Sequence, residues 1–227
     1  MRTNHKTGRQ SGGKMSGIWE KIKERLGFGK RAEGDKEDDR VMYIIAGLGN
    51  PTREYEKTRH NVGFEVIDVL ADRLGTTVEE KKFKGCYGRG IIGGQKVLLL
   101  KPQTFMNLSG QCVQPLLAWH KIRPDQLVVV HDELDIPAGE LRFKKGGGNA
   151  GHNGLKSITQ LLGTPDFYRL RIGIGRPPQK GDVINWVLGR PCSEDADKIR
   201  TATDKALEVL EIFAKKGLEA AVRATRS

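Results

Sequence analysis

The residues of this chain that are best suited to chemistry lie in one short stretch, "AGLGNPTREYEKTRHNVG", residues 46–63. His60 stands just before an apolar pattern over residues 62–74 that predicts an amphipathic helix. The N-terminus of a helix lowers the pKa of a histidine by disfavouring the cation, so the imidazole stays neutral and can accept a proton. Asp132, near the end of "VVVHDE", is the candidate carboxylate to orient that imidazole. A helix-capping or surface histidine is the competing interpretation.

Gly47 and Gly49 in the same stretch are spaced like the opening of a dinucleotide-binding turn. That motif requires a third glycine, and the chain has Thr52 in its place. The proline that follows Asn50 also biases this residue away from helical backbone, so no helix begins where a pyrophosphate would need it. We therefore interpret the glycines as a tight exit from a strand that presents Asn50.

Four polar loops each follow a predicted strand: "GLGNP", "KPQTFMN", "HDELD" and "KKGGGNAGHNG". Open α/β sheets usually place their functional groups at this edge. Three of the loops carry an asparagine, namely Asn50, Asn107 and Asn153. An amide donates and accepts hydrogen bonds without adding charge, which suits it to hold a carbonyl or a peptide. Any one of these asparagines could instead be a turn residue or a helix cap.

A metal site is the alternative use of the acidic loop. Its candidate ligands are His131, Asp132, Glu133, Asp135 and His152. Neighbouring residues on a strand point to opposite faces, so these side chains cannot all converge. The chain has neither an HExxH motif nor a GxSxG nucleophile elbow, and no feature beside Ser109 would activate its hydroxyl. If the protein is a hydrolase, an activated water molecule is the simplest nucleophile.

The formal net charge is +11 for 227 residues, which is consistent with an anionic partner such as nucleic acid. Lys144 and Lys145 precede the glycine-rich loop, and Arg169 and Arg171 lie on a later predicted strand. These cations could bind a phosphate, but not through a Walker loop, because the lysines precede the glycines. A solvated row of charges at the edge of a sheet is the competing interpretation.

The composition favours one domain with an appended segment. Residues 1–40 predict a basic, mostly disordered extension, within which "SGIWEKIKERLGFG" has the spacing of a short amphipathic helix. Residues 41–227 are expected to form the catalytic domain. The longest apolar run, 41–46, is too short to span a membrane, and the polar N-terminal residues lack the apolar core of a signal peptide. Three widely spaced cysteines, Cys86, Cys112 and Cys192, are typical of reduced thiols in the cytoplasm.

The elements that must position these residues alternate between strands and helices. Short β-branched runs predict strands that begin near residues 41, 127 and 168, and 86–102 predicts a hairpin that turns at Gly93 and Gly94. Helical patterns cover 61–75, 108–122, 182–191, 193–217 and the segment after the glycine-rich loop, and Pro115 must kink the second of them or delay its start. This alternation predicts an α/β fold, a single domain with a twisted, mixed and largely parallel sheet flanked by helices on both faces.

Several of these segments occur together in a known family. "GLGNP", "YEKTRHNVG", "KPQTFMNLSG", "HDELDIPAG", "GGGNAGHNGLKSI", "RLRIGIGRP" and "VLGRP" resemble bacterial-type peptidyl-tRNA hydrolase in order and spacing, over about residues 42–225. The resemblance implies hydrolysis of the ester between a peptide and the 3′-terminal ribose of tRNA, which recycles tRNA from stalled translation. It further implies a monomeric, cytoplasmic enzyme that needs neither a metal nor an organic cofactor.

The resemblance also implies roles for the catalytic residues. His60 would be the general base that activates water, and Asp132 would stabilise its proton-accepting form. Asn50 would sense the first peptide amide of the substrate. Asn107 and Asn153 would hold the peptide and position the water or the developing oxyanion.

The remaining matched residues concern the tRNA. Tyr55 and Phe105 would line the cleft for the acceptor end, and Lys144 and Arg171 would clamp the 5′-phosphate. Two other classes of function stay open at this point. One is a non-catalytic RNA-binding protein on the same fold, and the other is a nucleotide- or metal-dependent enzyme that acts on a small molecule.

Overall fold

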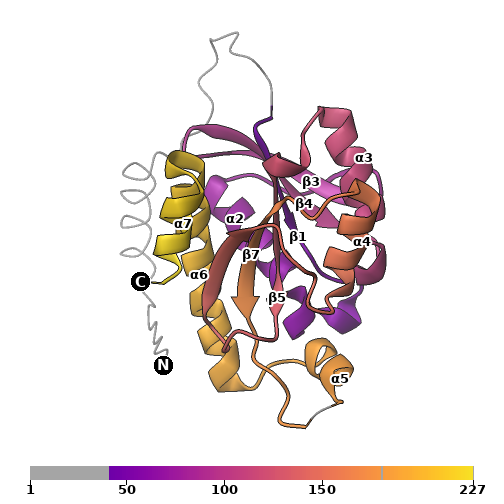
Figure 1. The fold of residues 1–227 in the computed structure, drawn as a ribbon, viewed down its shortest axis with the longest axis vertical. Coiled ribbons are helices and arrows are strands. Elements are labelled where there is room, and N and C mark those ends of the chain that lie inside the picture. Colours follow the sequence, from indigo (N-terminus) through magenta and orange to yellow (C-terminus); the bar gives the residue numbers. More distant parts are fainter. Residues whose placement is uncertain (1–40, 180, 227) are drawn as a thin grey trace, which may run out of the picture.

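The computed structural model of the chain describes residues 41–179 and 181–226 (Figure 1). The short amphipathic helix that we expect within residues 1–40 lies outside the described residues. Strands and helices alternate along the described chain, and helices lie against both faces of a central sheet.

The sheet is a single mixed one, and within the described residues it has seven strands in the order β2-β3-β4-β1-β5-β7-β6. β4, β1, β5 and β7 run parallel to one another, whereas β3 is antiparallel to β4 and β6 is antiparallel to β7. The strands are β1 (Tyr43–Gly47), β2 (Glu80–Lys82), β3 (Gly85–Ile92), β4 (Gln95–Pro102), β5 (Leu127–Glu133), β6 (Leu141–Lys145) and β7 (Tyr168–Gly173). The predicted α/β fold with a mixed, largely parallel sheet is confirmed.

The helices form a layer on each face of the sheet, which places one apolar core on either side. Ile45 and Val128 face the core under α2, α6 and α7, whereas Ile44 and Val129 face the core under α3 and α4. Successive side chains of a strand alternate between faces, so central strands buried on both sides become almost entirely apolar. The helices are α2 (Val62–Leu74), α3 (Gly110–His120), α4 (Asn153–Leu162), α5 (Val183–Leu188), α6 (Ser193–Lys216) and α7 (Leu218–Ala224).

The predicted hairpin is confirmed, with β3 and β4 joined at Gly93 and Gly94, whose φ angles are 57° and 83°. The sequence did not indicate β2 or α7, and it set no bounds for the strand before the glycine-rich loop, which is β6. Lys144 and Lys145, which we assigned to a loop, instead end the edge strand β6. Its alternation of buried and exposed residues spans only five positions, which is too short for a clear period-2 signal.

Pro115 lies inside α3 and does not delay its start, because the helix begins at Gly110. A proline at this position removes the N–H that would bond to the carbonyl of Gln111. The helix persists because Val113, Leu116 and other side chains are fully buried in the core shared with α4. Tertiary packing therefore offsets the local cost of the proline.

Gly47 and Gly63 allow α2 to pack closely against the end of β1. A Cβ atom on Gly47 would lie 2.1 Å from the carbonyl oxygen of Gly63, which is well inside any permitted contact. A Cβ atom on Gly63 would in turn lie 2.4 Å from the backbone nitrogen of Leu48. These contacts bring the start of α2, and with it His60, against the end of β1.

Candidate active site

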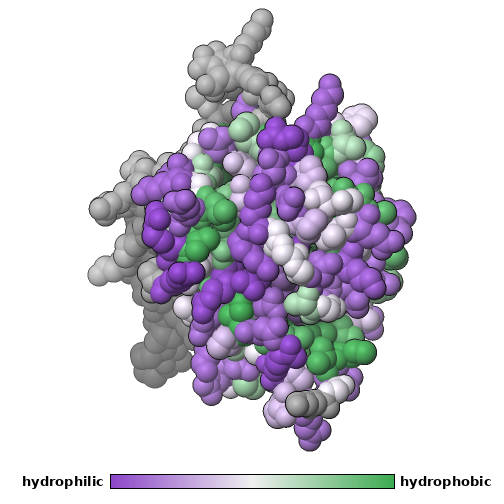
Figure 2. Space-filling view, in the orientation of Figure 1, coloured by the Kyte–Doolittle hydropathy of each residue, from purple (hydrophilic) through white to green (hydrophobic). Residues whose placement is uncertain are grey.

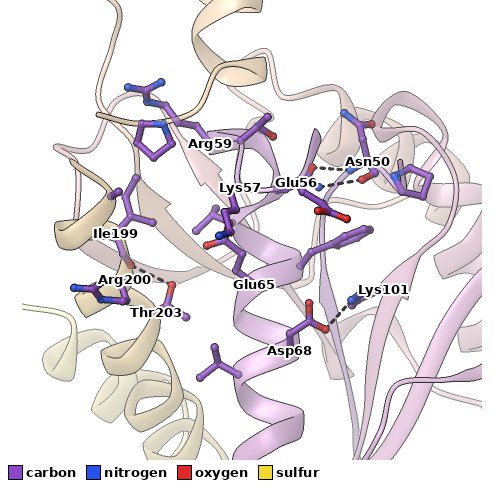
Figure 3. A pocket seen from close by; sticks show the side chains of 18 of the residues that line it. Asn50, Glu56, Lys57, Arg59, Glu65, Asp68, Lys101, Ile199, Arg200 and Thr203 are labelled. Atoms are coloured by element: carbon purple, nitrogen blue, oxygen red, sulfur yellow. Dashed lines mark hydrogen bonds and ion pairs between the residues drawn. The ribbon is translucent and has the colours of Figure 1, made fainter. Parts of the chain in front are cut away.

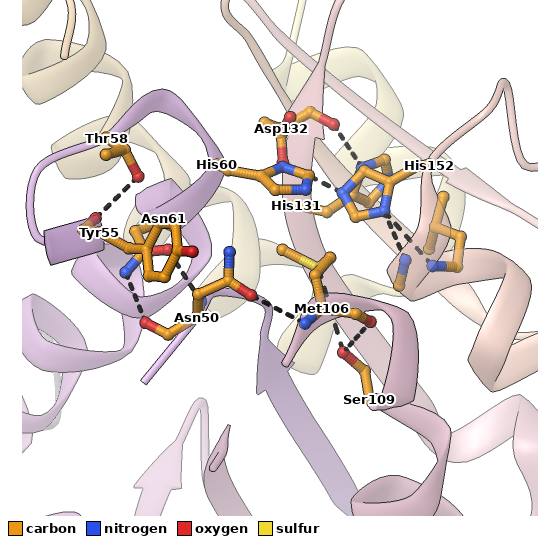
Figure 4. A network of polar contacts seen from close by, with 12 residues as sticks. Asn50, Tyr55, Thr58, His60, Asn61, Met106, Ser109, His131, Asp132 and His152 are labelled. Carbon is orange, nitrogen blue, oxygen red and sulfur yellow. Dashed lines mark hydrogen bonds and ion pairs between the residues drawn. The ribbon is translucent and has the colours of Figure 1, made fainter. Parts of the chain in front are cut away.

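Asn50 follows β1 and is held by three hydrogen bonds. Its backbone N–H donates to Asn61 Oδ1 at 2.8 Å, and Asn61 Nδ2 donates back to the carbonyl of Asn50 at 3.0 Å. The backbone N–H of Met106 donates to Asn50 Oδ1 at 2.8 Å. Because the oxygen of the Asn50 amide is occupied by a donor, the NH2 group must be the end that faces the space below His60 (Figure 4).

His60 lies in a 3-10 turn, Arg59–Asn61, directly before α2, which agrees with the predicted position at a helix N-terminus. His60 Nδ1 lies 2.8 Å from Asp132 Oδ1, and the imidazole is 12% exposed. The contact with an ionised carboxylate requires the proton on Nδ1, so the lone pair of Nε2 is directed into the cleft (Figure 4).

The pKa of His60 differs from the expectation based on the helix terminus. Burial lowers the pKa of His60, but the charge of Asp132 and the hydrogen bond to it outweigh burial, so the net pKa is raised above its ordinary value of 6.5. The expected lowering was therefore wrong. A full carboxylate charge at hydrogen-bond distance exceeds the partial charge of a helix terminus.

Asp132 stands at the centre of the polar network and is 3% exposed. Burial on its own raises the pKa of Asp132, but His60 and His152 lower it by their charges and hydrogen bonds, and the net pKa is far below the ordinary range. Asp132 therefore stays ionised throughout the pH range in which His60 titrates.

His152 was missed as an active-site partner, since the sequence placed it only in a candidate metal cluster. Its Nε2 lies 3.0 Å from Asp132 Oδ1, the same oxygen that contacts His60. Its Nδ1 accepts the backbone N–H groups of Gly154 at 3.1 Å and Leu155 at 3.4 Å, so the side chain caps the N-terminus of α4. The signal in the sequence was a polar residue at the start of a helical pattern after the glycine-rich loop.

The other predicted cleft residues surround this network. The rings of Tyr55 and Phe105 meet edge to face with centroids 6.5 Å apart, and Phe105 is half-exposed. Asn107 is exposed in a 3-10 turn, Met106–Leu108, next to the residue that holds Asn50. Asn153 is exposed in the first turn of α4, next to His152.

Arg59 was also missed, and it fixes the turn that carries His60. The Arg59 side chain is 6% exposed and its guanidinium lies 3.7 Å from the centroid of the Trp186 ring. It donates to the carbonyl of Arg190 at 3.0 Å and lies 3.7 Å from Asp195. Arg59, the residue directly before His60, thus connects the 3-10 turn to α5 and to the start of α6.

The predicted phosphate-binding cations have two different environments. Arg169 is 1% exposed and donates to the carbonyls of Gly147 and Gly148, so it supports the glycine-rich loop from inside and does not present its charge to solvent. Lys144 and Arg171 are half-buried, on neighbouring strands β6 and β7. Burial and the charges of Arg171 and Arg169 lower the pKa of Lys144, as expected where cations are crowded together. The surface over these strands is mainly hydrophilic, with small hydrophobic patches (Figure 2).

The metal cluster expected as an alternative does not assemble in the predicted form. Glu133 points to Arg171, with Oε2 3.7 Å from Nη1, and Asp135 pairs with Arg176 at 2.6 Å. Three ligand atoms of His60, Asp132 and His152 do lie within 4.8 Å of one another. Each imidazole already bonds to Asp132, and the second nitrogen of His152 caps α4, so we interpret the three side chains as a proton-bearing network.

A cavity of about 690 Å³ lies on the other side of the loop that carries Asn50 and His60. Its walls come from that loop, from α2 and from the first half of α6, and they include Glu65, Asp68 and Arg200 (Figure 3). Asn50 and Asn61 contribute to the same wall. The loop that carries His60 therefore contributes both to this cavity and to the network around Asp132.

An imidazole oriented by a buried carboxylate, among amide side chains at the carboxyl ends of parallel strands, is the kind of site that α/β enzymes use for general acid–base chemistry. The chain belongs to the peptidyl-tRNA hydrolase family, whose model, described as "Peptidyl-tRNA hydrolase", matches residues 44–227. The predicted family is thereby confirmed, and the chain is a hydrolytic enzyme.

Individual relatives agree with the family match. The peptidyl-tRNA hydrolase of Desulfovibrio desulfuricans is 59% identical, with 79% of this chain and 82% of that protein covered. That of Bacillus subtilis is 49% identical, with 75% and 90% covered. A crystal structure of peptidyl-tRNA hydrolase from Acinetobacter baumannii is 41% identical, has a TM-score of 0.79, and is matched over 84% of this chain and 98% of that chain.

Proposed function

We propose that this enzyme hydrolyses the ester between peptide and tRNA with a water molecule that His60 activates as general base. The observation that carries the proposal is the 2.8 Å contact between His60 Nδ1 and Asp132 Oδ1. Because Asp132 holds the Nδ1 proton, the lone pair of Nε2 can take a proton from water as that water attacks the ester carbonyl. The imidazolium that forms is stabilised by the carboxylate, and its proton can then pass to the leaving ribose hydroxyl.

Amide donors would stabilise the charge that develops on the carbonyl oxygen. Asn50 would sense the first peptide amide of the substrate, and its own amide is oriented before substrate arrives because Met106 occupies its oxygen. Asn107 and Asn153 present exposed amides next to Met106 and His152, where they could hold the peptide and position the water or the oxyanion. An oriented donor of this kind contributes about 3 kcal/mol to the transition state.

The tRNA would be bound on both sides of this chemistry. Tyr55 and Phe105 offer an aromatic rim for the acceptor end, which suits stacking on bases. Lys144 and Arg171 bring two cations together on neighbouring strands and would clamp the 5′-phosphate. The net charge of +11 supports long-range attraction of a polyanion.

Hydrolysis of an N-blocked aminoacyl-tRNA by the purified protein tests the proposal. His60→Ala should lose almost all turnover, whereas His120→Ala, which changes a half-buried histidine at the end of α3, should not. Turnover that survives EDTA would support an ester hydrolysis without a metal cofactor. Full turnover by His60→Ala would overturn the general-base role.

We further infer that the enzyme acts in the cytoplasm as a monomer and that residues 41–227 are its catalytic domain. Among the helices of the described residues, none is both long and apolar enough to cross a bilayer. All three cysteines are unpaired, which suits a reducing compartment. The substrate itself belongs to translation, which also favours this location.

A further inference from the structure

We propose that His152 is a positioning residue for the reaction: as a hydrogen-bond donor of fixed tautomer, it holds Asp132 in place and limits how strongly Asp132 draws a proton onto His60. The inference deepens the proposed function, because it rests on His60 as the general base. It gives a role to His152, to which the resemblance to the family assigned none.

The backbone of α4 fixes the tautomer of His152. Its Nδ1 accepts the N–H groups of Gly154 and Leu155 at 3.1 and 3.4 Å, and an acceptor nitrogen cannot carry a proton. The neutral ring must therefore carry its proton on Nε2, where it donates to Asp132 over 3.0 Å. A second proton on Nδ1 would face two backbone donors and would remove the cap of the helix.

His60 and His152 compete for one oxygen. Both donate to Asp132 Oδ1, at 2.8 and 3.0 Å, and Asp132 is 3% exposed, so little water takes part. A carboxylate oxygen that accepts two hydrogen bonds has less negative charge to offer to each donor than one that accepts a single bond. Asp132 therefore holds the proton of His60 less strongly than an isolated aspartate would, and more of the base stays in its neutral, active form.

Packing keeps the ring of His152 in this arrangement. Its centroid lies 5.0 Å from that of His60 and 4.9 Å from that of His131, so it is enclosed between two imidazoles. His131 is almost fully buried and donates its Nδ1 proton to the backbone carbonyl of Asp132 at 2.7 Å. Burial, followed by the neighbouring His152, lowers the pKa of His131 well below its ordinary value, so this ring supports the arrangement without adding charge.

Other charged side chains near the network are paired with groups of opposite charge. On β5 and β7, Glu133 Oε2 lies 3.7 Å from Arg171 Nη1, so these two groups form an ion pair beside Asp132. On the side of the 3-10 turn, the cation of Arg59 is directed to Asp195 and to the ring of Trp186. Asp132 is thus the charge that sets the proton affinity of His60, and His152 is the donor that shares it.

His152→Asn isolates the proposed role. Asparagine is a good N-cap and can still accept the N–H groups of Gly154 and Leu155, but it is too short to donate to Asp132. The titration midpoint of His60, followed by nitrogen-15 NMR of the imidazoles, should rise by roughly 0.5 to 1 pH unit, since a hydrogen bond to a charged group is worth roughly 1 to 2 pH units and only part of the charge freed on Asp132 acts on His60. The midpoint of the acid limb in the pH profile of kcat/KM for N-blocked aminoacyl-tRNA should rise by the same amount. In the unmodified enzyme the neutral form of His152 should be the Nε2–H tautomer.

Thr159→Val is the matched control, because it removes a hydrogen bond from Thr159 to Asn149 that supports α4 and does not involve Asp132. This variant should change neither the NMR titration midpoint of His60 nor the midpoint of the acid limb of kcat/KM. If both midpoints of His152→Asn equal those of the control, the proposal is overturned and His152 is only a helix cap. If the NMR midpoint of His60 rises but the acid limb does not, the role of His152 holds and the assignment of His60 as the base fails.

Discussion

The side-chain oxygen of Asn50 accepts the backbone N–H of Met106 at 2.8 Å, and this one contact decides which end of the Asn50 amide faces the cleft. The two residues come from different loops, one after β1 and one after β4. β1 and β4 are parallel neighbours, so both loops leave the sheet at the same edge. The donor end of the Asn50 amide is thus oriented by the fold before any substrate is bound.

Asn50→Asp tests this orientation with almost no change of shape. The carboxylate can still accept from Met106, but it replaces the donor in the cleft by an acceptor with a negative charge. We expect kcat to fall by about 10²- to 10³-fold, as for the loss of an oxyanion donor, with a melting temperature close to that of the parent enzyme. Turnover within a few-fold of the parent would show that the amide does not contact the reacting group.

The raised pKa of His60 predicts a pH profile. The base is active only when neutral, so kcat/KM should increase with pH through a midpoint above the ordinary value of 6.5. The free energy of unfolding depends on pH in the opposite direction. The raised pKa of His60 contributes stability at pH values below the pKa of this residue in the unfolded chain, and the contribution is lost as pH rises through its pKa in the folded protein. Rate profiles and thermal melts from pH 5 to 9 would measure both effects.

Asp132→Asn should reverse the direction of that shift. With the carboxylate gone, burial is the influence that remains, and it lowers the pKa of His60. The acid limb should therefore move below 6.5, while the plateau of kcat falls by about 10²- to 10⁴-fold because the tautomer of His60 is no longer fixed. An unchanged acid limb would contradict the assigned cause of the shift.

Lys144→Ala and Arg171→Ala should each raise KM for a tRNA substrate and reduce the dependence of KM on salt concentration. Each removes one cation from a phosphate contact, so the slope of log KM against log salt should decrease by about one. Arg89→Ala is the control, because this exposed arginine on β3 pairs with Glu80, near the other edge of the sheet from β7 and β6. A salt slope equal to that of the control would remove these residues from the tRNA interface.

Arg59→Ala should affect both stability and turnover. The change leaves the carbonyl of Arg190 without its donor and removes the stacking on Trp186, so we expect a loss of about 2 to 4 kcal/mol in the free energy of unfolding. The turn that carries His60 would also loosen, and kcat should fall more than KM rises. Arg59→Lys should not restore either property, because lysine lacks the planar guanidinium. A stable variant with full kcat would show that the turn does not depend on α5.

Deletion of residues 1–40 should leave kcat and KM unchanged. The residues proposed for the reaction all lie between 50 and 171, and the family model begins at residue 44. Comparing the shortened and complete chains on the same substrate measures the effect directly. A large loss of turnover would assign the extension a part in catalysis or in tRNA binding.

Much of the site was accessible from the sequence because its residues stand beside strong local signals. Asn50 follows a buried strand, His60 precedes a regular helical pattern, and Asp132 comes two residues after a run of valines. Predicting these elements was enough to place all three residues at one edge of a parallel sheet.

The signals that failed were short or ambiguous. β6 has too few alternating positions to fix where it ends, so Lys144 was assigned to the loop that follows it. Arg169 has the same charge as Arg171, and the sequence could not show that one is buried under the glycine-rich loop and the other half-exposed. His152 was considered only as a metal ligand, because its helix cap depends on where α4 begins.

The sequence by itself therefore determined the fold class, the family and the residue types that meet at the active site, because these depend on local periodicity and on motifs in order. The tertiary structure decided which atom of each polar side chain faces the cleft. The Asn50 amide is oriented by Met106, 56 positions away, and the His60 imidazole by Asp132, 72 positions away. A hydrogen bond depends on the separation and direction of two atoms in space, and only the packing of the whole sheet brings such distant positions together.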